Sequence, residues 1–185
     1  MKAALYYHLL IPVAAVCGDM LVSRTRDMSQ SRMRSFELVG TDGLSRSLGA
    51  QRGRPVVVAF FKTTCGASGL AFPYLQRLHE AYGQQGLAVW GVSQDGLQET
   101  LAFAAAAGAT FPVLLDTSLD VSAAYRLDVV PAFFLLDGAG KPAFSSAGFS
   151  KADINEMARL AGKLAGADAV IIAPDGDGRP PYRPG

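Results

Sequence analysis

Residues 55–69 read PVVVAFFKTTCGASG and combine two patterns that meet at one loop. The run from Pro55 to Phe61 is continuously apolar and rich in β-branched and aromatic residues, which is typical of a central strand buried on both faces. From Leu70 onward, apolar residues recur at steps of three and four until Gly83. That spacing predicts an amphipathic helix that ends at the glycine. A buried strand that leads into such a helix is the building unit of an α/β protein.

The same alternation continues on both sides of this unit. Further strands are expected at residues 36–39, 87–92, 111–115, 132–136 and 142–146. Trp90 lies inside one of these patterns and is expected in the core. Alternating strands and helices require a mainly parallel sheet covered by helices on both faces, and the turn at 137–140 adds an antiparallel edge. The predicted class is therefore α/β with a central mixed sheet.

Three more helices are expected after the first one. The helix at 96–107 should bury one face, consisting of Leu97, Leu101, Ala104 and Ala105. A short helix through Tyr125 should begin at Thr117, which has capping-box spacing to Asp120. The last helix should begin at Ser150, with Asp153 at its third position and a buried stripe of Ile154, Met157, Ala158, Ala161 and Leu164. His79, on the first helix, is expected to be a solvated surface imidazole.

Composition excludes several classes of function. The chain has 185 residues with 17 Lys and Arg against 16 Asp and Glu. A near-neutral balance argues against nucleic acid or an anionic membrane as the main partner. Two cysteines, Cys17 and Cys65, form neither a zinc pattern nor a disulfide-stapled scaffold. Since GxGxxG, GxxxxGK[ST] and HExxH are also missing, the sequence predicts neither a cofactor nor a metal.

The two ends differ in composition from the middle of the chain. Residues 1–34 are expected to be an extension, or a weak signal segment plus a linker. Their apolar part, Ala3 to Val16, is too short to span a bilayer. His8 and Pro12 interrupt that part, which favours a cytoplasmic location and leaves export open. Residues 35–166 are expected to form one domain. Residues 167–185 should be a strand or loop and a Pro/Gly-rich tail that is disordered or draped over the surface.

Cys65 is the candidate for chemistry. It follows the carboxyl end of a buried strand, where ligands collect in open parallel sheets. It also precedes a helix, whose positive end and free amides favour the thiolate form of a cysteine. Lys62 could add to this effect. The competing interpretation is that Cys65 is a small buried hydrophobic residue, as many lone cysteines are.

The segments VVVAFFKTTCGAS, LAVWGVSQD, FPVLLD and AYRLDVVPAFFLLDGAGK, in this order, resemble the thioredoxin-like superfamily over about residues 36–166. The nearest branches are the thiol-disulfide oxidoreductases and the alkyl hydroperoxide reductase/thiol-specific antioxidant proteins. The resemblance implies a thioredoxin fold with an extra strand-helix insertion between the cysteine motif and a cis-proline. It makes Cys65 the nucleophile, places Ser68 at the resolving-cysteine position and makes Pro131 the cis-proline. The implied substrate groove consists of Thr64, Gly66, Ala67 and Val130.

Ser68 is the main departure from that family pattern. A hydroxyl cannot close a disulfide, so a CGAS motif would form mixed disulfides with protein or small-thiol substrates and would need an external thiol reductant. A one-cysteine peroxidase is an alternative, although Val58 and Lys62 stand where peroxiredoxins have a proline and a Thr or Ser. A redox-inactive binding module is another, because a groove beside a cis-proline can hold an extended peptide without thiol chemistry.

Overall fold

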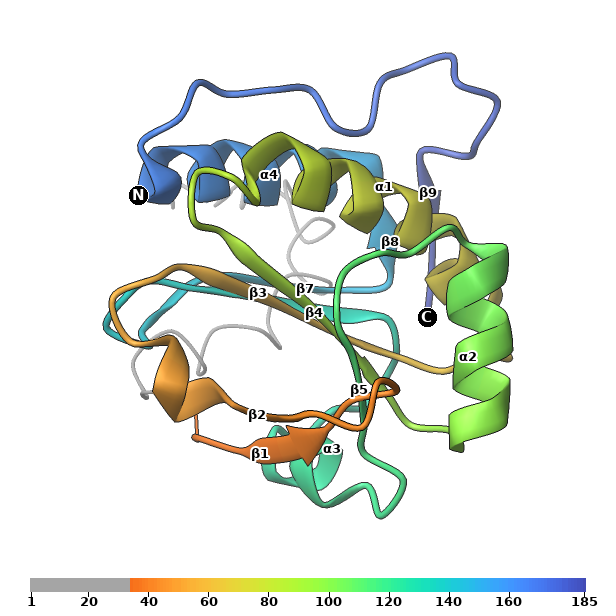
Figure 1. The fold of residues 1–185 in the computed structure, drawn as a ribbon. Helices are drawn as coiled ribbons and strands as arrows, with labels where there is room; N and C mark the ends of the chain where they lie inside the picture. Colours follow the sequence, from red (N-terminus) through yellow and green to blue (C-terminus); the bar gives the residue numbers. More distant parts are fainter. Residues whose placement is uncertain (1–33) are drawn as a thin grey trace, which may run out of the picture.

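The computed structural model describes residues 34–185 (Figure 1). The expectations for residues 1–33, including the signal segment and Cys17, lie outside this range. The described elements are, in order, β1 (Glu37–Val39), β2 (Ser45–Ser47), the 3-10 helix η1 (Leu48–Gln51), β3 (Val56–Phe61), α1 (Gly66–Tyr82), β4 (Ala88–Ser93), α2 (Leu97–Ala106), β5 (Val113–Leu115), α3 (Asp120–Ala124), β6 (Ala132–Leu136), β7 (Pro142–Ala147), β8 (Phe149–Ser150), α4 (Lys151–Ala165) and β9 (Tyr182–Arg183). Among these residues, no helix is both long and apolar enough to cross a membrane.

The central sheet has five strands in the order β5-β4-β3-β6-β7. β3 is parallel to β4, and β4 is parallel to β5. β6 runs antiparallel to both β3 and β7. All six residues of β3 are buried, as expected for a strand at the centre of a sheet that is covered on both faces. The predicted α/β class with a mixed sheet is confirmed.

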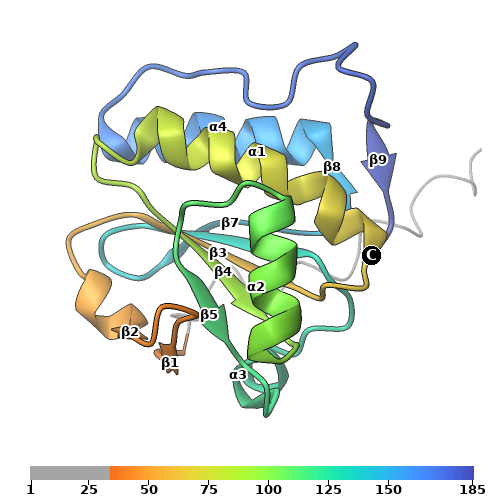
Figure 2. The same cartoon turned by 45° about the vertical axis from the view of Figure 1, so that its right-hand side comes forward.

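Two hydrophobic clusters cover the two faces of this sheet. On one face, α1 and α4 lie side by side over β3 and β6 (Figures 1 and 2), and their apolar stripes pack on Val57, Ala59 and Phe61. On the other face, Trp90 packs with Phe36 and Tyr125. Because alternate strand residues point to opposite faces, the apolar run of β3 contributes side chains to both clusters.

The predicted buried face of α2 is wrong for Leu97, Leu101 and Ala105, whereas Ala104 does pack against the core. Leu97 and Leu101 are each 41% exposed, whereas Thr100 is fully buried. The helix instead turns Phe103 inward, where its ring stacks on Phe61 at a centroid distance of 5.1 Å and meets Phe72 at 4.7 Å. α2 is rich in alanine, so several of its faces are about equally apolar, and the aromatic contacts select one of them.

Three further expectations for the helices need correction. α3 begins at Asp120 with Leu119 as its N-cap, so Thr117 does not cap it. Leu164 is 39% exposed and lies outside the buried stripe of α4, although Ser150 does cap that helix by accepting from the Asp153 amide. His79 is half-buried against Phe111 rather than solvated, since α1 turns it toward the aromatic cluster.

The segment after α4 has a defined path over the surface. It runs along α4 and α1 and ends as β9, which pairs with β8 (Figure 1). Polar side chains of the helices hold it: the Asn155 carboxamide accepts from the amides of Ile172 and Ala173 and donates to the Ala173 carbonyl. The segment is therefore draped over the surface, one of the two states expected for it, with Ile172 and Ala173 buried against the helices.

Candidate functional site

Cys65 occupies the N-cap position of α1. Its backbone is extended, and its carbonyl accepts from the Gly69 amide in the first turn. The side chain is half-buried and packs against the edge of the first core cluster. Its Sγ donates a hydrogen bond to the Val130 carbonyl oxygen at 3.2 Å. The thiol is therefore partly open to solvent and held against one particular backbone group.

The peptide bond between Val130 and Pro131 is cis, as the family resemblance implies. Pro131 is buried, and its carbonyl accepts from the Gly148 amide at 2.8 Å. This hydrogen bond ties the loop before β6 to the junction between β7 and β8. Pro131 is thereby fixed next to the Val130 carbonyl that the Cys65 thiol contacts.

Asp95 fixes the loop that carries the cysteine. Its carboxylate accepts from the Thr63 amide at 2.6 Å, and the Cys65 amide donates to the Lys62 carbonyl at 3.1 Å. Sequence reasoning missed Asp95. It follows the carboxyl end of β4, next to β3 in the sheet, so the rule that selected Cys65 could have selected it too.

Ser68 lies one turn along α1 from Cys65, and three-residue spacing makes the two side chains neighbours on the helix surface. It is fully buried, and its Oγ has no hydrogen-bond partner among residues 34–185. Of the expected groove residues, Thr64 and Gly66 are exposed and Val130 is half-buried, whereas Ala67 is 1% exposed and belongs to the core. Ala67 is thus placed away from any substrate.

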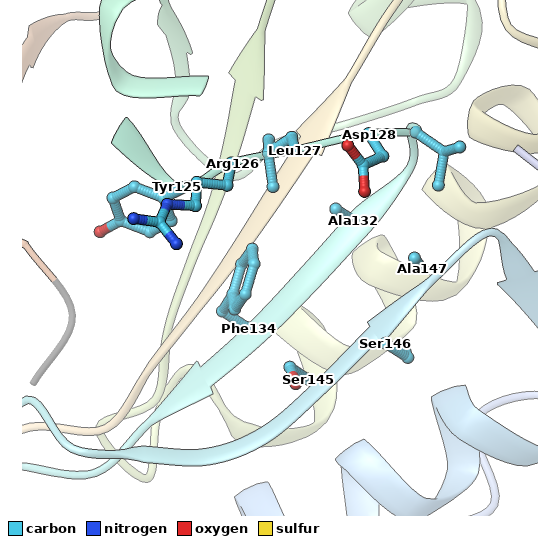
Figure 3. Close-up of a pocket in the computed structure, with 10 residues that line it drawn as sticks. Tyr125, Arg126, Leu127, Asp128, Ala132, Phe134, Ser145, Ser146 and Ala147 are labelled. Carbon is cyan, nitrogen blue, oxygen red and sulfur yellow. The ribbon is translucent and has the colours of Figure 1, made fainter. Parts of the chain in front are cut away.

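A hollow lies under residues 125–129 (Figure 3), on the sheet face opposite the core cluster that Cys65 contacts. Its volume is about 240 Å³, and residues 125–129 form one wall while β6 and β7 form the other. Phe134 and Ala132 form an apolar floor, and Asp128 and Arg126 stand on the loop above it. Arg126 is thus separate from the Cys65 thiol. Within residues 34–185, no group of three His, Cys, Asp or Glu side chains could hold a metal.

The sequence pattern that defines the AhpC/TSA family matches residues 30–143, which is more than half of the chain. This protein belongs to the AhpC/TSA family. Its curated relatives include the thiol-disulfide oxidoreductase ResA of Geobacillus thermodenitrificans, which is 28% identical over 138 residues, covering 72% of this chain and 79% of ResA. A Mycobacterium tuberculosis protein described as a peroxiredoxin is 32% identical over 107 residues, covering 57% of this chain and 68% of that protein.

Solved structures place this family member in the thioredoxin fold. A Chlorobium tepidum protein described as the thiol:disulfide interchange protein DsbE superposes with a TM-score of 0.68 at 25% identity, covering 72% of this chain and 95% of that chain. The expected superfamily and fold are thereby confirmed. β4, α2, β5 and α3 lie between Cys65 and Pro131, the interval in which the resemblance places an extra strand and helix.

Proposed function

We propose that this protein is a thiol-disulfide oxidoreductase that uses Cys65 as its single nucleophile in the CGAS motif. The observation that carries the proposal is the contact of Cys65 Sγ, at the start of α1, with the carbonyl of the residue before cis-Pro131. A half-buried thiol at this place can meet a disulfide from solvent. The ResA and DsbE relatives support the same reaction class.

The reaction is thiol-disulfide exchange. The Cys65 thiolate attacks one sulfur of a substrate disulfide, a new S–S bond forms, and the other substrate sulfur leaves as a thiolate. An external thiolate then attacks the substrate sulfur of the mixed disulfide, and Cys65 leaves as a thiolate. The second step requires the external thiol because Ser68 carries no sulfur.

The Val130 carbonyl acts in docking. In the resting protein it accepts from the Cys65 thiol. Once the thiol loses its proton it can no longer donate, and the carbonyl becomes free to accept from the backbone amide of an extended substrate. Deprotonation of the nucleophile and exposure of a docking group thus occur together.

The test is a pair of variants followed by intact mass. With glutathione disulfide, the parent protein should gain one glutathione and hold it until a thiol is added, while Cys65→Ser should gain none. Ser68→Cys should form an internal disulfide and reduce insulin with a thiol donor, whereas the parent should reduce it far more slowly. A parent protein that never gains glutathione would refute the proposal.

Peroxide reduction is a second candidate, favoured by the family match and by the peroxiredoxin relative. Here the thiolate would attack a peroxide oxygen, the O–O bond would break, and Cys65 would become a sulfenic acid while water or an alcohol leaves. Two thiol equivalents would restore the thiol. Against this candidate, Arg126 lines the hollow under residues 125–129 and Lys62 is exposed. Among residues 34–185, the hydrogen-bond partner of the sulfur is the Val130 carbonyl and neither of these cations.

Hydrogen peroxide with a sulfenic-acid probe separates the two reactions. An oxidoreductase should label slowly and without sustained turnover, at a rate close to that of a free thiol. Sustained, thiol-dependent consumption of peroxide that disappears in Cys65→Ser would make the peroxidase the better assignment. A binding module would show neither reaction and would keep its affinity for a partner after Cys65→Ala.

A further inference from the structure

Residues 181–185, here called the strap, lie beside the cysteine site. β9 of the strap pairs antiparallel with β8, with Arg183 opposite Phe149 and Tyr182 opposite Ser150. The Lys151 amide adds a hydrogen bond to the Pro181 carbonyl at 2.9 Å. In Figure 2 the strap descends past the first turn of α1. It therefore runs as an extended strand between the start of that helix and the cis-proline loop.

Three glycines show how closely the strap approaches the site. A Cβ added at Gly185 would collide with the Val130 oxygen, the same atom that accepts from Cys65. One added at Gly66 would lie 2.7 Å from the Arg183 guanidinium, and one at Gly148 would lie 3.2 Å from the Arg183 carbonyl. The strap thus touches backbone on both sides of the thiol.

The strap is held much less firmly than the segment before it. Every residue from Pro180 to Gly185 is exposed, and Tyr182 is 60% exposed. The upstream anchor is Asp177, which accepts from the buried Lys151 ammonium at 2.5 Å and from the Tyr74 hydroxyl. A short, exposed strand pair with a firm anchor upstream can open locally while the anchor stays in place.

Charge does not explain why the strap lies there. Arg183 places a guanidinium at the first residue of α1, and the positive end of a helix repels a cation. Backbone pairing with β8 is what holds the strap. Since that pairing depends on an extended backbone rather than on particular side chains, another extended chain could form it.

We propose that the strap occupies the docking surface for the extended segment of a protein disulfide substrate, and so competes with that substrate from within the chain. The surface consists of β8, the Val130 carbonyl and Gly66. This inference rests on the proposed function for the identity of the substrate. A substrate segment would pair with β8 in place of β9 and present its disulfide to Cys65. Its apparent affinity would be lowered by the fraction of time in which the strap covers the surface.

The kinetic test compares the full chain with a variant that ends at Gly178 and so retains Asp177. The probes are an extended peptide whose one cysteine is disulfide-linked to thionitrobenzoate, and 2-hydroxyethyl disulfide, which has no peptide backbone. The shortened variant should react about tenfold faster with the peptide and less than twofold faster with the small disulfide. Tyr182→Gly, which makes the extended backbone of the strap less favourable, should move in the same direction by less, and Arg159→Ala, an exposed arginine on α4, should match the parent.

A binding test without redox chemistry separates this inference from the proposed function. In a Cys65→Ser background, the amide resonances of Phe149, Ser150 and Lys151 are followed while a cysteine-free version of the peptide is added. The shortened variant should titrate at about tenfold lower peptide concentration than the full chain. Equal titration midpoints in the two chains, or no change of these amide resonances in either chain, would overturn the proposal that the strap competes with substrate. Absence of any mixed disulfide with Cys65 would instead overturn the proposed function. The titration would then still show whether an extended peptide binds at β8 in competition with the strap.

If the shortened variant unfolds at a lower temperature than the parent, Pro181→Gly combined with Tyr182→Gly in the full-length chain replaces it. That variant keeps the anchor and weakens only the pairing with β8. If this variant and the parent reach their titration midpoints at the same peptide concentration, the strap does not compete with the peptide.

Discussion

Cys65 and Ser68 stand one helical turn apart in contrasting surroundings. The thiol is half-buried and hydrogen-bonded, while the hydroxyl is fully buried and without a partner in the part of the chain that the structure describes. An unpaired buried hydroxyl costs stability, whereas a thiol tolerates an apolar site because its hydrogen bonding is weak. The surroundings of Ser68 therefore suit a sulfur better than an oxygen.

This contrast predicts that Ser68→Ala stabilises the protein. Removing an unpaired buried hydroxyl should raise the free energy of unfolding by about 1 kcal/mol, because no hydrogen bond is lost. Chemical denaturation measures the change. Ser93→Ala is the matched control: Ser93 is equally buried but hydrogen-bonds to Thr100 at 2.7 Å, so its loss should destabilise by about 1 kcal/mol. A destabilised Ser68→Ala would show that the hydroxyl has a partner.

At the scale of elements, α3 is capped by a residue at the end of the preceding strand and not by the residue that the capping-box spacing selects. Its first amides are capped by Asp116, whose carboxylate accepts from Val121 at 3.1 Å and from Ser122 at 2.7 Å. Thr117 has the right spacing for a cap, but Leu119 adopts a left-handed backbone and begins the helix later. Asp116 lies at the end of β5, so the sheet itself positions the cap.

Asp116→Ala should therefore destabilise the protein by about 1–2 kcal/mol, the usual loss for a capping side chain. The carboxylate is 1% exposed, and the amides that it satisfies would be left unpaired. Thermal or chemical unfolding gives the magnitude, and faster amide exchange over residues 120–127 would localise it. Asp120→Ala, an exposed acid at the first position of the same helix, is the control and should cost less than half as much.

The elements also show which sequence patterns were informative. β3 and β6 match the predicted strands almost residue for residue, because a continuous apolar run can be satisfied only at the centre of a covered sheet. The predicted buried face of α2 was wrong because its many alanines make several faces of the helix almost equally apolar. Phe103 decides the direction only once Phe61 and Phe72 are placed around it.

At the scale of the whole molecule, one ion pair anchors the tail to the helical layer. Hydrogen bonds from the Lys151 ammonium, which has the larger effect, and from the Tyr74 hydroxyl hold the pKa of Asp177 well below its usual range. Because the pKa of Asp177 is lower in the attached state, the ionised carboxylate stabilises attachment at any pH above the ordinary pKa of 3.8. This stabilisation is lost progressively as the pH falls below 3.8. Attachment of the tail should thus weaken in acid before the core unfolds.

Amide exchange tests this pH dependence at Arg179, whose N–H donates to Asp177 at 3.1 Å. Protection at this amide should be constant near neutral pH and should fall as the pH drops below 3.8. Asp177→Asn should lower the protection at every pH and remove the acid transition. Asp42→Asn is the control, because Arg46 depresses the pKa of Asp42 in a similar way far from the tail. An unchanged acid transition in Asp177→Asn would assign the anchor to another group.

The sequence by itself determined the layers of this protein and two members of its candidate site. Cys65 could be placed because it follows a strong apolar run, whose burial is a local requirement, and Pro131 because the order of the motifs resembles the thioredoxin-like superfamily. Tertiary structure decided the rest: the unpaired state of Ser68, the hold of Asp95 on the cysteine loop, and the passage of residues 181–185 beside the thiol. Those features depend on single polar or backbone contacts between distant residues, and such contacts leave no period in the chain.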